Sequence, residues 1–107
     1  MKISEVRDFA LSLPESSETP HFDKTSFRIG QKIFATIPPH GDVLHVFVDE
    51  DETRSCVAQD PTVFEELWWG KKLVGLRVAL ERADADLVRE LLQDAWRRKA
   101  PKPRLHP

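Results

Sequence analysis

Basic and aromatic side chains gather in the second half of the chain, in a pattern suited to binding phosphates. One group surrounds a glycine at residue 70 and consists of Trp69, Lys71, Lys72 and Arg77. A second group has five positive charges with no acidic residue between them: Arg97, Arg98, Lys99, Lys102 and Arg104. Cations without internal partners bind phosphate, and an indole beside them can stack on an exposed base. These residues predict a nucleic-acid-binding surface.

The same residues also have a purely structural interpretation. Lys and Arg near the end of a helix complement its dipole, a charged tail stays solvated, and tryptophans fill a core. Both interpretations stay open at this point. Arg28 and Lys32 flank the pair Gly30 and Gln31 and would add a second basic hairpin, or wing, to the surface.

No pattern for catalysis or metal binding accompanies these cations. His21, His40 and His45 lack the helical or clustered spacing of zinc ligands. The run of carboxylates at 49–52 lacks the alternation and the glycine of a calcium loop, and it suits the start of a helix. Cys56 has no histidine near it in sequence and is expected to be a half-buried thiol on a helix. We expect no enzyme, no cofactor and no metal site.

The charge of the chain is divided unevenly. The formal net charge is −2, which by itself argues against a protein that coats DNA or an anionic membrane. Residues 1–66 carry 6 basic and 13 acidic side chains, a net −7, whereas residues 67–107 carry 10 basic and 5 acidic, a net +5. An anionic partner is therefore expected to bind the C-terminal part.

Length and composition predict a single small globular protein. With 107 residues, 40% hydrophobic and 32% charged, the chain can build one core. Residues 1–100 are expected to form one domain, followed by a basic, proline-containing tail at 101–107. No apolar run can span a bilayer, residues 1–20 do not resemble a signal peptide, and one cysteine suits a reducing compartment. These features predict a cytoplasmic protein that does not bind membranes.

Hydrophobic periodicity predicts the elements that would position the cations. Apolar residues at helical spacing indicate a first helix, capped by Ser4 and ended before Pro14. Residues 15–24 are expected to be a polar connection. Residues 25–29 and 32–37 alternate with period two around Gly30 and predict a hairpin, and the apolar residues 43–48 predict a third, central strand.

The second half of the chain predicts two further helices and two strands. A helix starts in the acidic run at 49–52 and reaches Gln59, and residues 63–68 fit a strand or a loop. Residues 73–80 alternate and predict a strand. The last helix, capped by Asp84 or Asp86, ends by Ala100. The expected fold is α+β in the order α-β-β-β-α-β-β-α, a two-layer antiparallel sheet with helices packed on one face.

Three stretches of the chain resemble the MmcQ/YjbR family of small bacterial proteins. They are the first-helix string VRDFALSLP at 6–14, the hairpin FRIGQKIF at 27–34 and the closing stretch DLVRELLQDAWRRKAP at 86–101. The resemblance extends over nearly the whole chain. It implies a two-layer α+β fold similar to that of type III secretion chaperones, and DNA binding in which two hairpins act as wings.

Two functions from different classes remain as hypotheses. The first is a DNA-binding module that contacts phosphates through the basic hairpin turn and the C-terminal end. The second is a protein-interaction or chaperone-like module that uses an exposed sheet face or edge, either with another protein or as a homodimer. The three tryptophans and the near-neutral charge motivate the second hypothesis.

Overall fold

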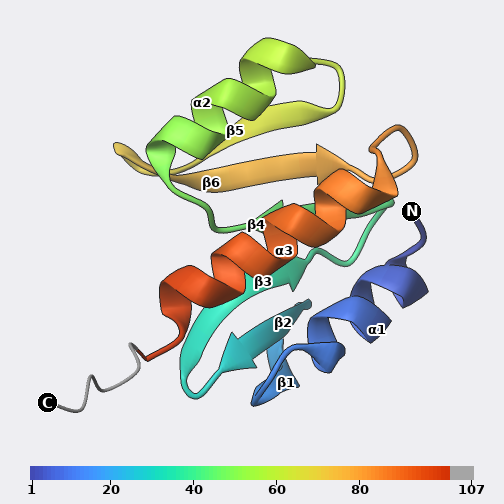
Figure 1. Cartoon of the computed structure of the whole chain (residues 1–107), viewed down its shortest axis with the longest axis vertical. Coiled ribbons are helices and arrows are strands. Elements are labelled where there is room, and N and C mark those ends of the chain that lie inside the picture. The colour runs from blue at the N-terminus through green and yellow to red at the C-terminus, as the bar shows by residue number, and fades with distance from the viewer. Residues whose placement is uncertain (102–107) are drawn as a thin grey trace, which may run out of the picture.

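The computed structural model describes residues 1–101, which form a six-stranded antiparallel sheet and three helices (Figure 1). In chain order the elements are α1 (Ile3–Ser12), β1 (Ser16–His21), β2 (Lys24–Ile29), β3 (Lys32–Ile37), β4 (Val43–Val46), α2 (Glu50–Gln59), β5 (Phe64–Trp69), β6 (Lys72–Ala79) and α3 (Ala85–Lys99). The strands lie in the order β1-β2-β3-β4-β6-β5. The predicted α+β fold and order of elements are confirmed, with one additional strand.

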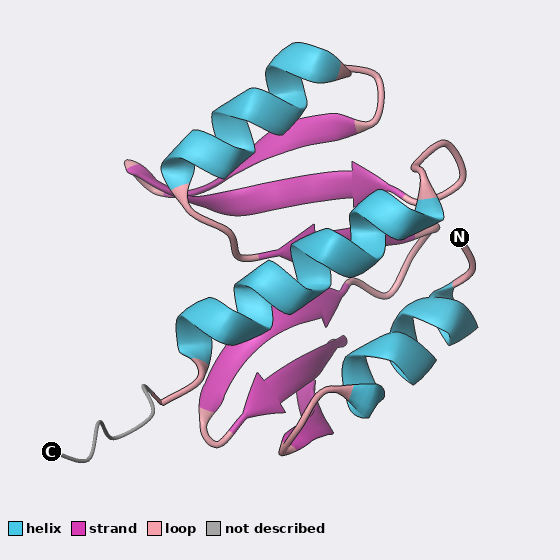
Figure 2. Ribbon diagram, in the orientation of Figure 1, coloured by secondary structure: helices cyan, strands magenta, loops and turns pink. Residues whose placement is uncertain are grey.

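The helices and the sheet make two layers. All three helices lie on the same face of the sheet, as the ribbon in Figure 2 shows. α3 lies along the middle strands β2, β3 and β4, whereas α2 covers β5 and β6 and α1 packs against β1 and α3. No helix in residues 1–101 is long and apolar enough to cross a membrane.

The additional strand, β1, corrects the expectation that residues 15–24 are a connection. β1 pairs with β2 along its whole length, from Ser16 opposite Ile29 to His21 opposite Lys24. Its sequence shows no alternation of polar and apolar residues, because an edge strand with no fully buried side chain needs none. Pro20 is compatible with this position since an edge strand leaves one row of amides unpaired.

The helix starts follow from local hydrogen bonds. The predicted cap Ser4 is wrong, because α1 begins at Ile3 and Glu5 Oε1 accepts from the amide of Lys2 at 3.0 Å. Asp49 caps α2 by accepting from the amide of Glu52 at 2.8 Å, so the acidic run does begin a helix. Of the two candidate caps for α3, Asp84 has this role, and its carboxylate accepts from the amide of Leu87 at 3.0 Å.

The core lies between the helices and the sheet. Fully buried residues on α1 and α3 are Val6, Ala10, Val88, Leu91, Leu92 and Ala95. They pack against strand residues that include Phe27, Phe34, Leu44, Val46, Leu76 and Val78. Each large side chain buried in this way stabilises the fold by roughly 1.5–3 kcal/mol.

The face of the sheet opposite the helices has a different composition. Residues that lie opposite each other in an antiparallel pair point to the same face. Leu44 and Val46 of β4 point toward the helices, so His45 between them points to the other face, together with its cross-strand partners Thr36 of β3 and Arg77 of β6. We call this the open face, since no helix of residues 1–101 covers it.

Candidate functional site

Two hairpin turns and the end of a helix lie along one side of the molecule. The β2–β3 and β5–β6 hairpins are both tight, and Gly30 and Gly70 each take φ +61° at their turns. Both turns and the C-terminal end of α3 lie on the left side of Figure 1. Elements far apart in the sequence therefore contribute side chains to one surface.

Residues from these three elements line a groove of about 430 Å³. Its cations are Lys32 at the start of β3, Lys72 at the start of β6, and Arg98 and Lys99 at the end of α3. Trp69 at the end of β5 also lines it. We call these five residues and the space between them the basic groove.

The positive charges of the basic groove are close enough to perturb one another. Burial lowers the pKa of Lys99, and the charges of Arg98, Lys32 and Lys72 lower it further. None of these four side chains forms an ion pair with another residue of the described chain. Arg98 instead donates to the carbonyl oxygen of Phe47 at 2.8 Å, which fixes its guanidinium at the groove. The four cations thus have no salt-bridge partner in the described chain, although Arg98 also lies near Glu52, whose pKa its charge lowers.

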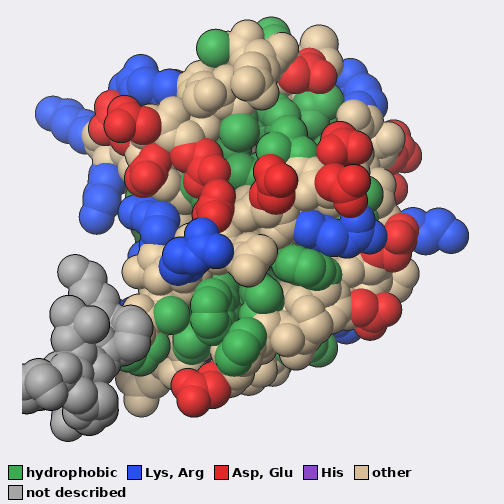
Figure 3. All heavy atoms as spheres, in the orientation of Figure 1, with side chains coloured by type: hydrophobic (Ala, Val, Ile, Leu, Met, Phe, Trp, Pro, Cys, Tyr) green, Lys and Arg blue, Asp and Glu red, His purple; other side chains and the backbone are tan. Residues whose placement is uncertain are grey.

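Acidic residues limit the groove on the side of α2. Asp49 and Glu50 also line it, but Asp49 caps the helix and Glu50 pairs with Arg54 at 2.9 Å. Figure 3 shows that blue side chains gather at the left edge of the helix-covered face, while red side chains follow the helices. An anion would therefore bind from the side of the hairpins.

The structure separates the predicted site residues into groups. Lys32, Trp69, Lys72, Arg98 and Lys99 line the groove, while Lys71 lies exposed in the turn beside it. The remaining three described residues lie elsewhere or already have partners. Arg97 pairs with Asp94 at 3.0 Å, Arg28 donates to Ser26 Oγ at 3.1 Å, and Arg77 lies on the open face. Lys102 and Arg104 lie outside the described residues.

The tryptophans do not all fill the core. Trp96 is half-buried and donates to the carbonyl oxygen of Pro14 at 3.0 Å, which joins α3 to the end of α1. Trp69 is 61% exposed, and its ring meets the edge of Phe47 at a centroid distance of 5.3 Å. The structural interpretation therefore holds for Trp96 and fails for Trp69, whose indole faces solvent beside the cations.

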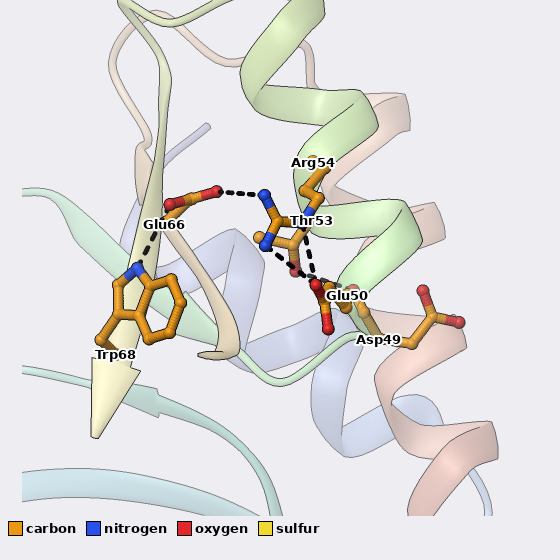
Figure 4. A network of polar contacts seen from close by, with 6 residues as sticks. All are labelled: Asp49, Glu50, Thr53, Arg54, Glu66 and Trp68. Carbon is orange, nitrogen blue, oxygen red and sulfur yellow. Dashed lines mark hydrogen bonds and ion pairs between the residues drawn. The ribbon is translucent and has the colours of Figure 1, made fainter. Parts of the chain in front are cut away.

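Trp68 belongs to a separate polar network, shown in Figure 4. Its indole nitrogen donates to Glu66 Oε1 at 3.2 Å, and Arg54 of α2 lies between Glu66 at 3.7 Å and Glu50 at 2.9 Å. Thr53 donates to the carbonyl oxygen of Asp49 at 2.8 Å. Of these contacts, the Arg54–Glu66 pair joins α2 to β5, and Trp68 is bonded to Glu66 of that pair and does not line the groove.

A second groove, of about 770 Å³, lies between α2 and α3. It contains the carboxyls of Glu52 and Asp94. Burial raises the pKa of Glu52 to about 7, with a further contribution from the hydrogen bond and the charge of Asp94. Burial also raises the pKa of Cys56, which lies on α2 as expected and carries less of the reactive thiolate than a free thiol.

This carboxyl pair predicts a pH-dependent stability. The pKa of Glu52 rises from 4.5 to about 7 on folding, so the folded state holds an extra proton between these values. Its contribution to stability is full below pH 4.5 and is lost as pH rises through 7. Because Glu52 is only partly buried, we expect about 1 kcal/mol. Glu52→Gln should be more stable than the wild-type protein at pH 8 by this amount, and most of the advantage should be lost at pH 5.

Urea unfolding of both proteins at several pH values measures this difference. His45 titrates in the opposite sense, since its pKa falls to about 4, but this residue is common to both proteins and cancels. Asp51→Asn removes a carboxylate from the same groove and serves as the control, which should show no such pH-dependent gain. An equal gain in stability in both variants would mean that the gain comes from the net charge of the protein and not from the environment of Glu52.

Within residues 1–101, no three His, Cys, Asp or Glu side chains lie close enough together to hold a metal ion. One histidine is nevertheless unusual. His45 is only 9% exposed, and its Nε2 has no hydrogen-bond partner among the described residues. Nothing in the sequence distinguished it, because its neighbours come from other strands.

Comparison with known proteins places this fold in a family. The YjbR family model matches residues 11–98. The crystal structure of the Deinococcus radiodurans protein DR2400, which carries a DUF419 domain, is similar with a TM-score of 0.79 and 22% identity, covering 89% of this chain and 75% of that chain. No curated protein matches the chain. At such identity the crystal structure supports the fold, whereas the family match spans most of the sequence. The chain belongs to the YjbR family.

Proposed function

We propose that the basic groove binds single-stranded DNA, with its cations on the phosphates and Trp69 on a base. The observation that carries this proposal is the convergence of Lys32, Lys72, Arg98 and Lys99 on one groove. Like charges held together raise the free energy of the folded protein unless an anion neutralises them. Burial lowers the pKa of Lys99 most, and the charges of Arg98, Lys32 and Lys72 lower it further, in the direction that this repulsion requires. A phosphate backbone supplies the missing negative charge at regular intervals.

The position of Trp69 favours a single strand over a duplex. Its indole is 61% exposed beside the cations, and Phe47 supports the ring from the edge. Stacking of a base on an exposed aromatic ring contributes roughly 1–3 kcal/mol and needs an unpaired base, whose face a duplex hides. The net charge of −2 fits a protein that binds through one local site.

A titration of a fluorescein-labelled ten-residue dT strand, followed by anisotropy at 50 mM NaCl, tests the proposal. Lys32→Gln combined with Lys72→Gln removes two groove charges and should weaken binding about tenfold. The control combines Lys2→Gln with Arg82→Gln, two exposed cations outside the groove, and should bind like the wild-type protein. No binding by the wild-type protein, or equal loss in both double variants, would refute a phosphate site in this groove.

A protein-interaction module is the second candidate, and the exposed aromatic residues favour it. Phe22 is 93% exposed at the β1–β2 turn, and β5 presents Trp68 and Trp69 at the other edge of the sheet. An edge strand with apolar side chains can pair with another chain. A dimer detected by light scattering, and abolished by Trp68→Ser with Trp69→Ser but not by Phe22→Ser, would support pairing through β5. A monomer at all concentrations would exclude a homodimer.

A further inference from the structure

The open face of the sheet contains a small cavity directly behind the basic groove. It has a volume of about 50 Å³ and is lined by His21, Lys24, Thr36 and His45 and by apolar side chains. All three apolar residues of the cavity, Ile33, Phe47 and Trp69, also line the basic groove. The cavity and the groove are therefore adjacent, and the Phe47–Trp69 pair lies between them.

His45, which lines the cavity, carries an unsatisfied hydrogen-bonding group. The side chain is 9% exposed, lines the cavity, and keeps Nε2 without a partner among residues 1–101. Leaving a buried polar atom unpaired costs roughly 1–3 kcal/mol, so such atoms are rare in folded proteins. An apolar side chain at this position would avoid that cost. The imidazole is thus better explained by a ligand than by the stability of the fold.

The charge state of His45 defines what it can recognise. Burial lowers its pKa to about 4, and the charges of Lys24 and Arg77 lower it further. The ring is neutral at pH 7 and has one donor and one acceptor nitrogen; in the tautomer protonated at Nε2, the unpartnered atom is the donor. Thr36 adds a hydroxyl and Lys24 an ammonium group at the same cavity, and both donate. The polar groups of the cavity therefore suit a ligand that presents hydrogen-bond acceptors.

The walls and the size of the cavity narrow the ligand further. Phe47, Trp69 and Ile33 provide aromatic and apolar walls, which favour a flat ring over a free anion. A volume of about 50 Å³ admits the edge of one ring rather than a whole purine. Thymine has two ring carbonyls on its edge, whereas adenine has none there.

We propose that this cavity receives the carbonyl edge of a pyrimidine from the strand bound in the basic groove, with His45 as a hydrogen-bond donor to it. The inference rests on the proposed function, because the groove holds the phosphates that bring the base to the cavity. Trp69 lines both the basic groove and the cavity, so its indole can contact the base whose edge enters the cavity. The protein would then prefer pyrimidine strands, thymine in particular.

The test compares ten-residue dT and dA strands on wild-type protein, His45→Leu, and the double variant of Lys32→Gln with Lys72→Gln. The wild-type protein should bind dT about tenfold more tightly, as expected for one or two hydrogen bonds to a base. His45→Leu should lose most of this preference while its affinity for dA stays unchanged. The double variant should bind both strands more weakly by the same factor and keep the preference for dT.

Two further measurements keep the test independent of folding. His45→Leu removes the unpaired nitrogen, so its urea midpoint should equal or exceed that of the wild-type protein, which excludes unfolding as the cause of lost preference. The side-chain nitrogen resonances of His45 should shift on addition of dT and not of dA. Equal affinity of the wild-type protein for both strands, or a preference for dT that His45→Leu retains, would overturn the proposed pyrimidine site in the cavity. The proposed DNA binding in the groove would stand. If neither strand binds, the proposed function itself fails.

Discussion

Gly75→Ala should lower the free energy of unfolding by about 3 kcal/mol, which corresponds to a fall in melting temperature of about 12 °C for a protein of this size. Gly75 lies in β6 where β4 ends and the chain turns away at Phe47. A Cβ atom on Gly75 would lie 2.1 Å from the carbonyl oxygen of Val46 and 2.9 Å from Cα of Phe47. Both are backbone atoms, so only a shift of β4 or β6 can relieve the clash.

A second glycine provides the control for this variant. Gly30 takes φ +61° in the β2–β3 turn, but a Cβ there meets nothing within 4 Å. Gly30→Ala should therefore cost only the conformational strain, about 1 kcal/mol. Chemical denaturation of both variants measures the difference. Equal losses would show that β4 and β6 can separate without cost, contrary to the close approach seen here.

The consequence of Gly75→Ala should extend to the candidate site. The amide of Phe47, just after β4, donates to the carbonyl oxygen of Phe34 at 3.1 Å. The ring of Phe47 contacts Trp69. A shift of the backbone at Phe47 would move the wall shared by the groove and the cavity. The variant should therefore change the near-ultraviolet circular dichroism of the aromatic residues even where it stays folded.

The sequence predicted elements whose pattern is local. The hairpin around Gly30 was identified from alternation and a glycine, and the structure pairs its strands across that turn. β1 was missed because its six residues are polar or partly exposed on both sides, and only backbone hydrogen bonds to β2 define it. An edge strand of this kind carries no periodic signal, so a single sequence cannot reveal it.

The candidate site shows the same division between local and non-local information. The cations of each hairpin and of the C-terminal helix were recognised separately, but nothing in the sequence brought Lys32 to Lys99. Arg97 and Arg98 were also predicted equally as site residues. The structure distinguishes them, since Arg97 is paired with Asp94 and Arg98 faces the groove. Helix geometry alone could have suggested the first pair, because residues 94 and 97 are one turn apart.

There is a physical reason why His45 was not predicted as a site residue. In the sequence it is one histidine in an apolar strand, and its significance comes from burial between Thr36 on one side and Arg77 on the other. Whether its Nε2 is satisfied depends on every side chain of the neighbouring strands. Such a property belongs to the folded sheet and has no counterpart in residue spacing.

Binding of single-stranded DNA should weaken roughly 50-fold when NaCl rises from 50 to 200 mM. Four phosphates neutralised by Lys32, Lys72, Arg98 and Lys99 would release counterions and give a slope of about −2.8 in a plot of log K against log salt. The double variant of Lys32→Gln with Lys72→Gln should halve the slope to about −1.4, so that the same change of salt weakens its binding only about sevenfold. Anisotropy titrations at five salt concentrations measure both slopes.

Trp69→Ala separates the contribution of stacking from that of charge. Stacking of a base on the indole releases no bound cation, so this variant should bind more weakly at every salt concentration by about tenfold while its slope stays near −2.8. The indole also lines one side of the groove. If Trp69→Ala acted only by opening the groove and disturbing its cations, both the affinity for DNA and the salt slope would change. Parallel lines for the wild-type protein and Trp69→Ala, together with a shallower line for the lysine double variant, would assign the cations to the phosphates and the indole to a base. A wild-type slope near zero would show that the anionic backbone is not what the groove binds.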